Sequence, residues 1–161
     1  MEQSSKTLTF VVPAYNMETY LERCVESLLS ATDNSDIEVL IVDDGSSDGT
    51  PELADMYERR WPGNVRAIHQ VNKGHGGAVN TGIANATGMY VKVVDADDWV
   101  DMPSIDTLMG TLRVQRVATD PVDMIVTNYV YDKVGKRVKH TVNFRHAMAA
   151  NTVLGWDDLG C

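Results

Sequence analysis

The chain has 161 residues, of which 43% are hydrophobic and 23% are charged, and its formal net charge is -9. This length is typical of one domain, the apolar content is too high for a disordered chain, and no uncharged apolar run is long enough to span a membrane. An acidic chain lacks the basic face that nonspecific nucleic-acid binding requires, so we expect no nucleic-acid partner.

The first predicted elements form a βα unit. Residues Leu8–Pro13 are a short, β-branched apolar run, which is typical of a buried strand. From Glu18 to Ala31, apolar residues recur at helical spacing, and Asn16 stands where it could cap that helix. The sequence therefore predicts a buried strand followed by an amphipathic helix.

The same alternation of strand and helix continues along the chain. The further predicted strands are Ile37–Val42, Val65–Val71, Tyr90–Val94, Met124–Tyr131 and Arg137–Val142, the last two joined by a turn at Gly135. The further predicted helices are one that Thr50 caps and that ends near Trp61, one over Ala78–Ala86, and one from Pro103 to about Ala118. Near-continuous apolar strands that alternate with helices predict an α/β fold, in which helices cover both faces of a mainly parallel sheet.

Polar clusters follow the predicted strands at their carboxyl ends. These clusters are Pro13-Ala14-Tyr15-Asn16, Asp43-Asp44-Gly45-Ser46, Asn72-Lys73-Gly74 and Asp95-Ala96-Asp97-Asp98. Ligands bind at this edge in open α/β sheets, so we expect the four clusters to converge on one site.

The last cluster places three carboxylates within four residues, Asp95, Asp97 and Asp98. Their mutual repulsion favours a bound cation, and carboxylate oxygens suit Mg²⁺ or Mn²⁺ with phosphate oxygens as further ligands. Such a metal would reconcile an acidic protein with an anionic substrate. The alternative is an acidic turn that is solvated at the surface.

The other clusters allow two interpretations each. One of Asp43 and Asp44 could hold the turn while the other accepts a hydrogen bond from a ligand imide N–H or hydroxyl. Tyr15 could stack on a heterocycle or pack half-buried. Lys73 could neutralise a phosphate or be solvated. The glycines after Asn72 do not complete a dinucleotide-binding fingerprint, because Val79 stands where its third glycine should be.

The four histidines show no metal-ligand spacing and are interpreted as ordinary surface or loop residues; they are His69, His75, His140 and His146.

Taken together, four segments resemble family 2 glycosyltransferases of the GT-A fold. The segments are VVPAYN at Val11–Asn16, EVLIVDDGSSDGT at Glu38–Thr50, NKGHGGAVNTGI at Asn72–Ile83 and VVDADDWV at Val93–Val100. The resemblance implies a Rossmann-like three-layer α/β/α sandwich over residues 1–161. It also implies inverting transfer of a hexosyl or N-acetylhexosaminyl group from a nucleotide-diphosphate sugar, of which UDP-sugars are the commonest, with Mg²⁺ or Mn²⁺.

The resemblance also assigns roles to individual residues. It places Pro13, Ala14, Tyr15 and Asp44 around the nucleoside base with Asp43 as a less certain neighbour, Asn72 and Gly74 at the floor of the nucleotide site, Asp95 at the ribose, and Asp97 or, alternatively, Asp98 at the metal. Asp95 and Asp97 form the DxD motif. Many relatives have Ala-Arg-Asn where this chain has Ala78-Val79-Asn80, so the role of that arginine is missing or supplied elsewhere.

The family's catalytic carboxylate base stands well beyond the DxD motif, so we expect it to lie beyond Cys161, with Asp158 as a weak candidate whose other interpretation is a helix cap. We therefore expect the donor-binding part of a longer enzyme of polysaccharide or cell-envelope glycan synthesis, with an exposed apolar edge that could make it a homo-oligomer.

Its acceptor would be a glycan or a lipid-linked sugar. The N-terminal residues MEQSSKTLTF do not resemble a signal peptide, which predicts a cytoplasmic chain, membrane-associated as part of a longer protein.

Two alternatives remain at this point. The first is a donor-binding module without turnover of its own. The second is a receiver-like phosphoacceptor domain, which also joins a doubly wound sheet to paired aspartates. In such a domain the acidic pair should follow the first strand, whereas a complete βα unit precedes Asp43 here.

Overall fold

The computed structural model describes residues 6–132, 139–144 and 152–155. The chain divides into two compact units, Met1–Ala118 and Thr119–Cys161. None of the helices in these described ranges combines the length and the hydropathy that crossing a bilayer requires.

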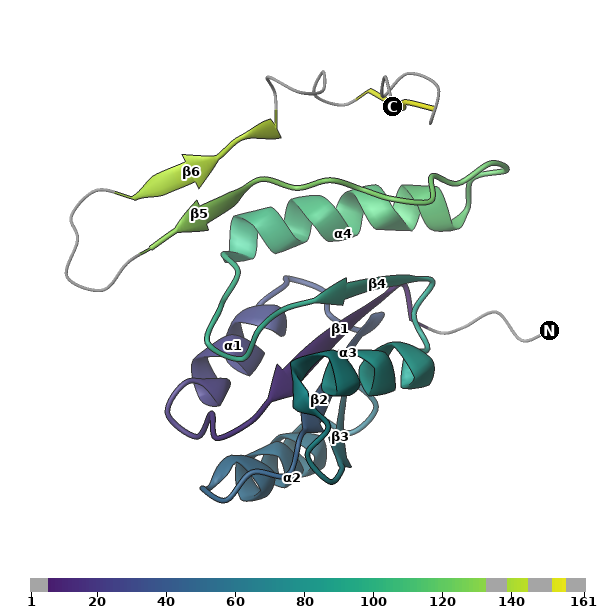
Figure 1. Ribbon diagram of the computed structural model, residues 1–161. Helices are drawn as coiled ribbons and strands as arrows, with labels where there is room; N and C mark the ends of the chain where they lie inside the picture. Colours follow the sequence, from purple (N-terminus) through teal and green to yellow (C-terminus); the bar gives the residue numbers. More distant parts are fainter. Residues whose placement is uncertain (1–5, 133–138, 145–151, 156–161) are drawn as a thin grey trace. The chain divides into compact units, whose positions relative to one another are not determined.

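The first unit contains four strands and four helices in alternation. They are β1 (Leu8–Ala14), α1 (Leu21–Leu28), β2 (Ile37–Asp43), α2 (Thr50–Arg60), β3 (Val65–His69), α3 (Gly74–Asn85), β4 (Tyr90–Val93) and α4 (Met102–Arg116) (Figure 1). The strands form one parallel sheet in the order β3-β2-β1-β4, in which Val11 of β1 pairs with Leu40 of β2 and with Val93 of β4. The predicted mainly parallel sheet is confirmed.

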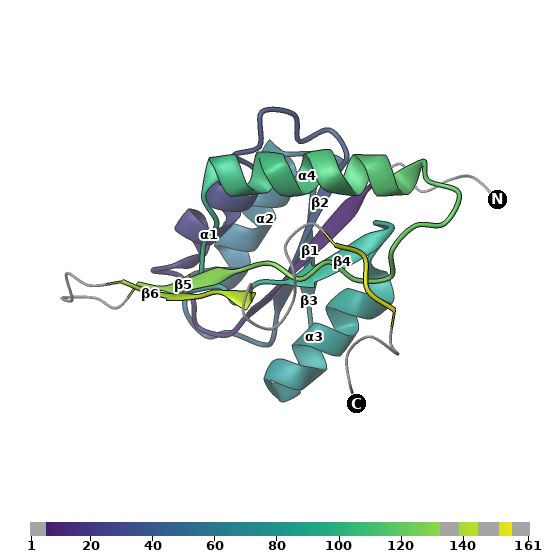
Figure 2. The same cartoon turned by 90° about the horizontal axis from the view of Figure 1, so that it is seen from above.

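The helices cover both faces of this sheet. Figure 2 shows α3 on one side and α1, α2 and α4 on the other. This arrangement follows from right-handed crossovers, because the chain moves in one direction from β1 to β3 and then returns past β1 to β4. The strand order therefore changes direction between β1 and β4, where ligands bind in open α/β sheets.

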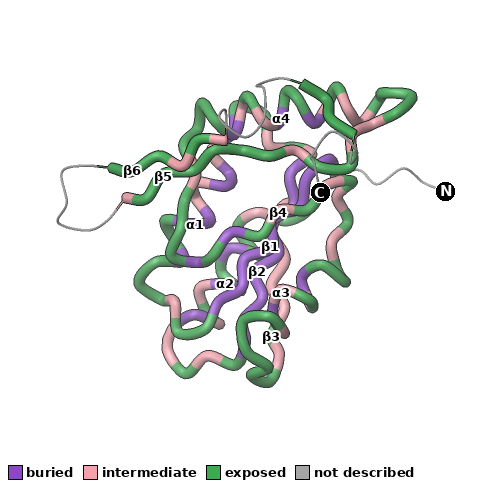
Figure 3. The backbone as a smooth tube through the Cα atoms, turned by 45° about the horizontal axis from the view of Figure 1, so that its top comes forward, coloured by how far each residue is buried: buried purple, intermediate pink, exposed green. Residues whose placement is uncertain are grey.

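The core lies around β1 and β2, whose seven residues each are all buried (Figure 3). Val11, Val42 and Ala78 form a buried apolar cluster between these strands and α3. A Cβ added at Gly82 would collide with the side chain of Val11, so α3 approaches β1 more closely than any other residue at this position would allow. This close packing accounts for the glycine at position 82, although glycine disfavours helix.

Three predicted helix starts differ from the structure. Helix α1 begins at Leu21 without a side-chain cap, and Asn16 does not cap it. The cap position of α2 is Gly49, so Thr50 is its first helical residue rather than its cap. Helix α3 begins at Gly74, four residues before the predicted start. In the first two cases, the polar side chain bonds to a neighbouring loop instead of its own helix.

The second unit contains a short antiparallel pair, β5 (Tyr129–Tyr131) and β6 (His140–Val142), in which Tyr129 pairs with Val142. Both strands are shorter than predicted, and Gly135 lies outside the described residues. The rings of Tyr129 and Tyr131 meet edge to face with centroids 5.4 Å apart. These residues are exposed in this unit, so little apolar burial is available to extend the strands.

Candidate functional site

The loops that follow β1 and β2 are joined by hydrogen bonds. Asn16 N donates to Ser46 Oγ at 3.0 Å, and Asn16 Oδ1 accepts from Ser47 N at 2.9 Å. Met17 N donates to Thr50 Oγ1 at 2.8 Å. Asn16 has a φ of 54°, a left-handed conformation that asparagine tolerates better than most residues. The two sequence motifs therefore form one structural piece.

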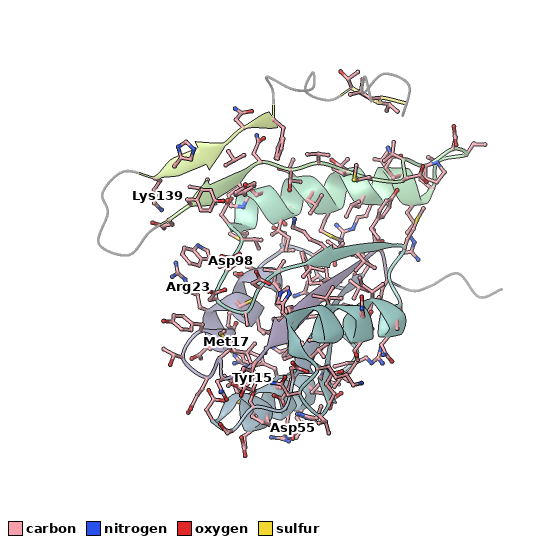
Figure 4. The ribbon with its side chains drawn as sticks, in the orientation of Figure 1. Tyr15, Met17, Arg23, Asp55, Asp98 and Lys139 are labelled. Carbon is pink, nitrogen blue, oxygen red and sulfur yellow. The ribbon has the colours of Figure 1, made fainter. Side chains whose placement is uncertain are left out.

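The end of β1 lies where the strand order changes direction, between β1 and β4. Val94 N donates to Val11 O, so Val11 faces β4, and Pro13, two residues further on, faces the same side. Strand β4 has ended at that level, so the missing N–H of Pro13 costs the sheet no hydrogen bond. Ala14 is buried, and its carbonyl accepts from Asp44 N at 2.9 Å. Tyr15 is 49% exposed and marks the start of the loop (Figure 4).

Asp44 is the most enclosed carboxylate at this edge, with only 2% of its surface exposed. Its Oδ1 accepts from Gln70 Nε2 at 2.6 Å and from Lys73 N at 2.8 Å. Burial alone would raise the pKa of Asp44, but hydrogen bonds from Gln70, Lys73 and Gly74 outweigh it and lower the pKa. Asp44 is therefore held ionised, with its side chain fixed by the loop that follows β3.

Asp43 has a structural role in the turn. It is 3% exposed, and its Oδ1 accepts from Ser46 N at 3.0 Å. Its Oδ2 lies 3.0 Å from Nδ1 of His69, and His69 Nε2 lies 3.1 Å from Oδ1 of Asp55. His69 is exposed, as expected of a surface residue, and it also bridges Asp43 and Asp55. The bridge could not be seen in the sequence, because the three residues belong to β2, β3 and α2.

Two glycines with left-handed backbones shape the loop after β3: Gly45, which belongs to the neighbouring loop after β2, and Gly74, which ends the loop. Gly45 has a φ of 73°, and a Cβ there would lie 3.0 Å from Asn72 N, so only glycine allows the loops to approach this closely. Gly74 has a φ of 77°, and its N–H donates to Asn72 Oδ1 at 3.1 Å. Asn72, Lys73 and Gly74 are all exposed at the start of α3.

Asp95 connects three elements. Its Oδ1 lies 2.8 Å from Nε2 of His75 in the first turn of α3. The thiol of Cys24, on α1, donates to the Asp95 carbonyl at 3.7 Å. His75 is exposed, as expected of a surface residue, and it lies in the first turn of α3 rather than in a loop. The contact brings the glycine-rich segment and the Asp95–Asp98 loop together, and no sequence spacing could reveal it.

Asp97 and Asp98 are exposed in the loop after β4, where Figure 4 labels Asp98. Partial burial, followed by the charges of Asp97 and Asp95, raises the pKa of Asp98. Burial and the same three carboxylates raise the pKa of the Cys24 thiol to about 12. A divalent cation would relieve this negative field, so the residues fit a hard metal ion in charge and donor type. No group of three His, Cys, Asp or Glu among the described residues is arranged as a complete metal cage.

One cation stands beside this acidic loop. The guanidinium carbon of Arg23, on α1, lies 3.3 Å from the ring centroid of Trp99, directly after Asp98. Val100 N donates to Ser27 Oγ at 3.1 Å, which fixes the same loop to α1. Sequence analysis missed Arg23, because its partner stands more than seventy residues away in the chain.

Two further findings concern the predicted site. The candidate base Asp158 lies outside the described residues. A cavity of about 470 Å³ between α1 and α2 is lined by Glu18, Glu22, Glu52 and apolar atoms of Leu53 and Met56, and contains none of the predicted site residues. Its three glutamates make it a poor place for an anionic ligand.

Fold and site together define an α/β protein whose candidate ligand-binding residues gather at the carboxyl edge of a parallel sheet. Residues 9–155 match the family described as Glycosyl transferase family 2. The chain therefore belongs to this family of glycosyltransferases, and its sheet and helices are those of the GT-A fold.

Individual proteins show the same relationship. The glycosyltransferase GlyG of Streptococcus pneumoniae serotype 4 is 40% identical over 131 residues, which are 80% of this chain and 41% of GlyG. The structure of S. aureus TarS 1-349 in complex with UDP has a TM-score of 0.61 and 26% identity, over 68% of this chain and 32% of TarS. The mannosyltransferase PcManGT from Pyrobaculum calidifontis in complex with GDP-Man and Mn²⁺ has a TM-score of 0.58 and 28% identity, over 71% of this chain and 32% of PcManGT. The chain thus spans less than half the length of each of these proteins.

Proposed function

We propose that this chain is the donor-binding part of an inverting glycosyltransferase. It binds a nucleotide-diphosphate sugar, most favourably a UDP-sugar, at the carboxyl edge of β1, β2, β3 and β4. The observation that carries the proposal is the joining of loops from all four strands. Asp44 accepts from Lys73 N, Asn16 accepts from Ser47 N, and Asp95 contacts His75. Side chains from segments far apart in sequence thereby share one edge.

The nucleoside would lie at the β1 and β2 end of this edge. Tyr15 is exposed enough to stack on a base, and Asp44 is an ionised acceptor for an imide N–H. Pro13 and Ala14 would support the base from the strand, with Asn72 and Gly74 below it. Asp43 would act indirectly, since its two oxygens already contact Ser46 and His69.

The diphosphate would lie toward the loop after β4. Asp95 would contact the ribose, and Asp97 or Asp98 would hold Mg²⁺ or Mn²⁺ together with phosphate oxygens. When bound, such an ion supplies positive charge that stabilises the departing diphosphate. The raised pKa of Asp98 supports a cation in this loop, and TarS with UDP and PcManGT with GDP-Man and Mn²⁺ are similar proteins that bind such ligands.

The second half of the reaction needs further groups. Single displacement requires a carboxylate base that removes the proton of the acceptor hydroxyl. We propose that this base and the glycan or lipid-linked acceptor site belong to the remaining part of a longer protein. A donor-binding module is then the function of residues 1–161 themselves.

Calorimetric titration with UDP, with and without Mn²⁺, tests the proposal. We expect binding that Mn²⁺ strengthens, and we expect Asp44→Ala to weaken it at least about tenfold, since a hydrogen bond to a charged group contributes about 1.5–3 kcal/mol. Asp120→Ala, which removes an exposed carboxylate in the other unit, is the matched control. Equal affinity of Asp44→Ala and the parent chain would show that the nucleotide binds elsewhere.

A further inference from the structure

Two residues to which the sequence analysis assigned no role form a relay that ends on Asp44: Gln70, which precedes the Asn72–Ile83 motif, and Thr81, which lies within it. Gln70 Nε2 donates to Asp44 Oδ1 at 2.6 Å, and Gln70 Oε1 accepts from Thr81 Oγ1 at 2.6 Å. Thr81 stands on α3, and Gln70 directly follows β3. Gln70 N also donates to Asp43 O at 3.0 Å, which fixes the backbone from which the side chain starts.

The hydrogen bonds of the relay can be donated in only one direction, from Thr81 to Gln70 and from Gln70 to Asp44. An ionised carboxylate can only accept, so the amide of Gln70 must turn its NH₂ group toward Asp44 and its oxygen toward Thr81. The Thr81 hydroxyl must then donate. Lys73 N–H is a second donor to the same Asp44 oxygen, and a backbone amide cannot reverse its role. Gln70 and Thr81 are both partly buried, so water replaces these bonds poorly.

We propose that Gln70 and Thr81 are positioning residues that fix Asp44 as a hydrogen-bond acceptor. Through Asp44 they select uracil, which carries a ring N–H, over cytosine, which has a lone pair at the same ring position. The inference rests on the proposed function, because it requires the nucleotide base to face Asp44. Gln70 and Lys73 both donate to Oδ1, and the Gly74 backbone is a further donor to Asp44, so we infer that the base meets the carboxylate from the Oδ2 side.

UDP and CDP are the ligands that isolate this effect. They have the same ribose and diphosphate, and their pyrimidine rings differ only at ring positions 3 and 4. Uracil N3–H would donate to the Asp44 carboxylate, whereas cytosine N3 would turn a lone pair toward it. A buried site that lacks a hydrogen-bond partner rejects the wrong ligand strongly, so we expect a UDP preference over CDP of at least about tenfold.

The test is the ratio of the Kd values of CDP and UDP, measured by calorimetry for the parent chain and four variants. Gln70→Glu places a second carboxylate against Asp44, so the pair takes up one proton. When Asp44 Oδ2 carries this proton, Asp44 can donate to cytosine N3. We expect the ratio of this variant to fall about tenfold. Thr81→Val removes the donor that holds the amide, and we expect a smaller fall. Thr81→Ser keeps the hydroxyl and should restore the parent ratio.

The matched control is Thr111→Val on α4, an exposed residue whose hydroxyl donates to the carbonyl of Thr107 one turn earlier in the same helix. Its ratio should equal that of the parent. Circular dichroism shows which variants fold, and the Thr81→Val and Thr81→Ser pair decides the question even where Gln70→Glu unfolds the chain.

The outcomes separate the two proposals. If UDP binds, Asp44→Ala weakens it, and Gln70→Glu and Thr81→Val keep the parent ratio, the relay has no role in selection while the proposed function stands. If neither UDP nor CDP binds, both proposals are overturned. Equal parent affinity for UDP and CDP also overturns the relay.

Discussion

His69 Nδ1 lies 3.0 Å from Oδ2 of Asp43, and this contact fixes the turn that presents the neighbouring Asp44. The other ring nitrogen of His69 faces Asp55 at 3.1 Å. Both carboxylates accept when ionised, so the imidazole must carry a proton on each nitrogen to satisfy both. Below the raised pKa of His69, a charged histidine between two carboxylates therefore holds the start of the candidate site.

The stability of the fold should decrease with rising pH because of this bridge. The hydrogen bond to Asp43 raises the pKa of His69, partial burial opposes it, and Asp55 raises it further. A raised pKa in the folded state gives stability that is fully present below the unfolded value of about 6.5 and is lost as the pH rises through the folded value.

Chemical denaturation measures this effect over a range from about pH 5 to about pH 9, which brackets the ordinary histidine pKa of about 6.5. The side chain of His69 is 42% exposed, so we expect the loss to stay below about 1 kcal/mol. His69→Gln should remove the decrease, and His140→Gln, in the other unit, should keep it. A parent curve that rises over this range would contradict the role of the bridge.

Alanine substitutions at two glycines should change the free energy of unfolding in opposite directions, because only one of the two glycines lies where α3 approaches β1. Gly82→Ala places a methyl group against Val11, so we expect a loss of about 1–3 kcal/mol in the free energy of unfolding. Gly110→Ala on α4 meets open space and should gain about 0.5–1 kcal/mol from helix propensity. Urea denaturation of the two variants checks both values, and an unchanged Gly82→Ala would show that the helix does not pack as closely as described.

The candidate metal loop can be tested through nucleotide affinity. Asp97→Ala should remove most of the Mn²⁺-dependent increase in UDP affinity, because an ion held by one or two carboxylates has few other protein ligands. The fold should persist, since Asp97 is exposed and contributes no core packing. Calorimetry with and without Mn²⁺ measures the effect, with Asp120→Ala as control. If the Mn²⁺ effect survives, Asp98 is the main ligand, and Asp98→Ala should then abolish it.

Cys24 should be inert in the folded protein. Its thiol is buried, and burial together with the nearby carboxylates raises its pKa to about 12, so little thiolate exists near neutral pH. In a Cys161→Ser background, a thiol reagent at pH 8, about the ordinary cysteine pKa, should label Cys24 only after a denaturant is added. Mass spectrometry of the labelled chain decides, and rapid native labelling would show that the loop after β4 opens away from α1.

The sequence predicted the parts of the fold that depend on local pattern. The apolar runs of β1 and β2 are continuous because both faces of a parallel sheet are covered, and the positions of Asp44 and Asp97 followed because parallel strands end at one edge. The order of the four predicted strands along the chain was therefore enough to place the polar clusters at the same edge.

The rest depends on partners that are distant in the chain. Asn16 and Thr50 have the residue types of helix caps, but loop contacts compete for their side chains. His69 and Gln70 lie close to a predicted motif and His75 lies within it, yet the partners of all three belong to other elements. No spacing rule finds such contacts, because each joins side chains of elements that meet only in the folded chain.

The most direct measurement of the central claim is an NMR titration of the isotope-labelled chain with UDP in the presence of Mg²⁺. Binding at the carboxyl edge of the sheet predicts shifts of backbone amides in the four loops, at Tyr15, Asp44, Lys73 and Asp97, and little change in α2. Shifts confined to Glu18, Glu22 and Glu52, around the cavity between α1 and α2, would contradict the account.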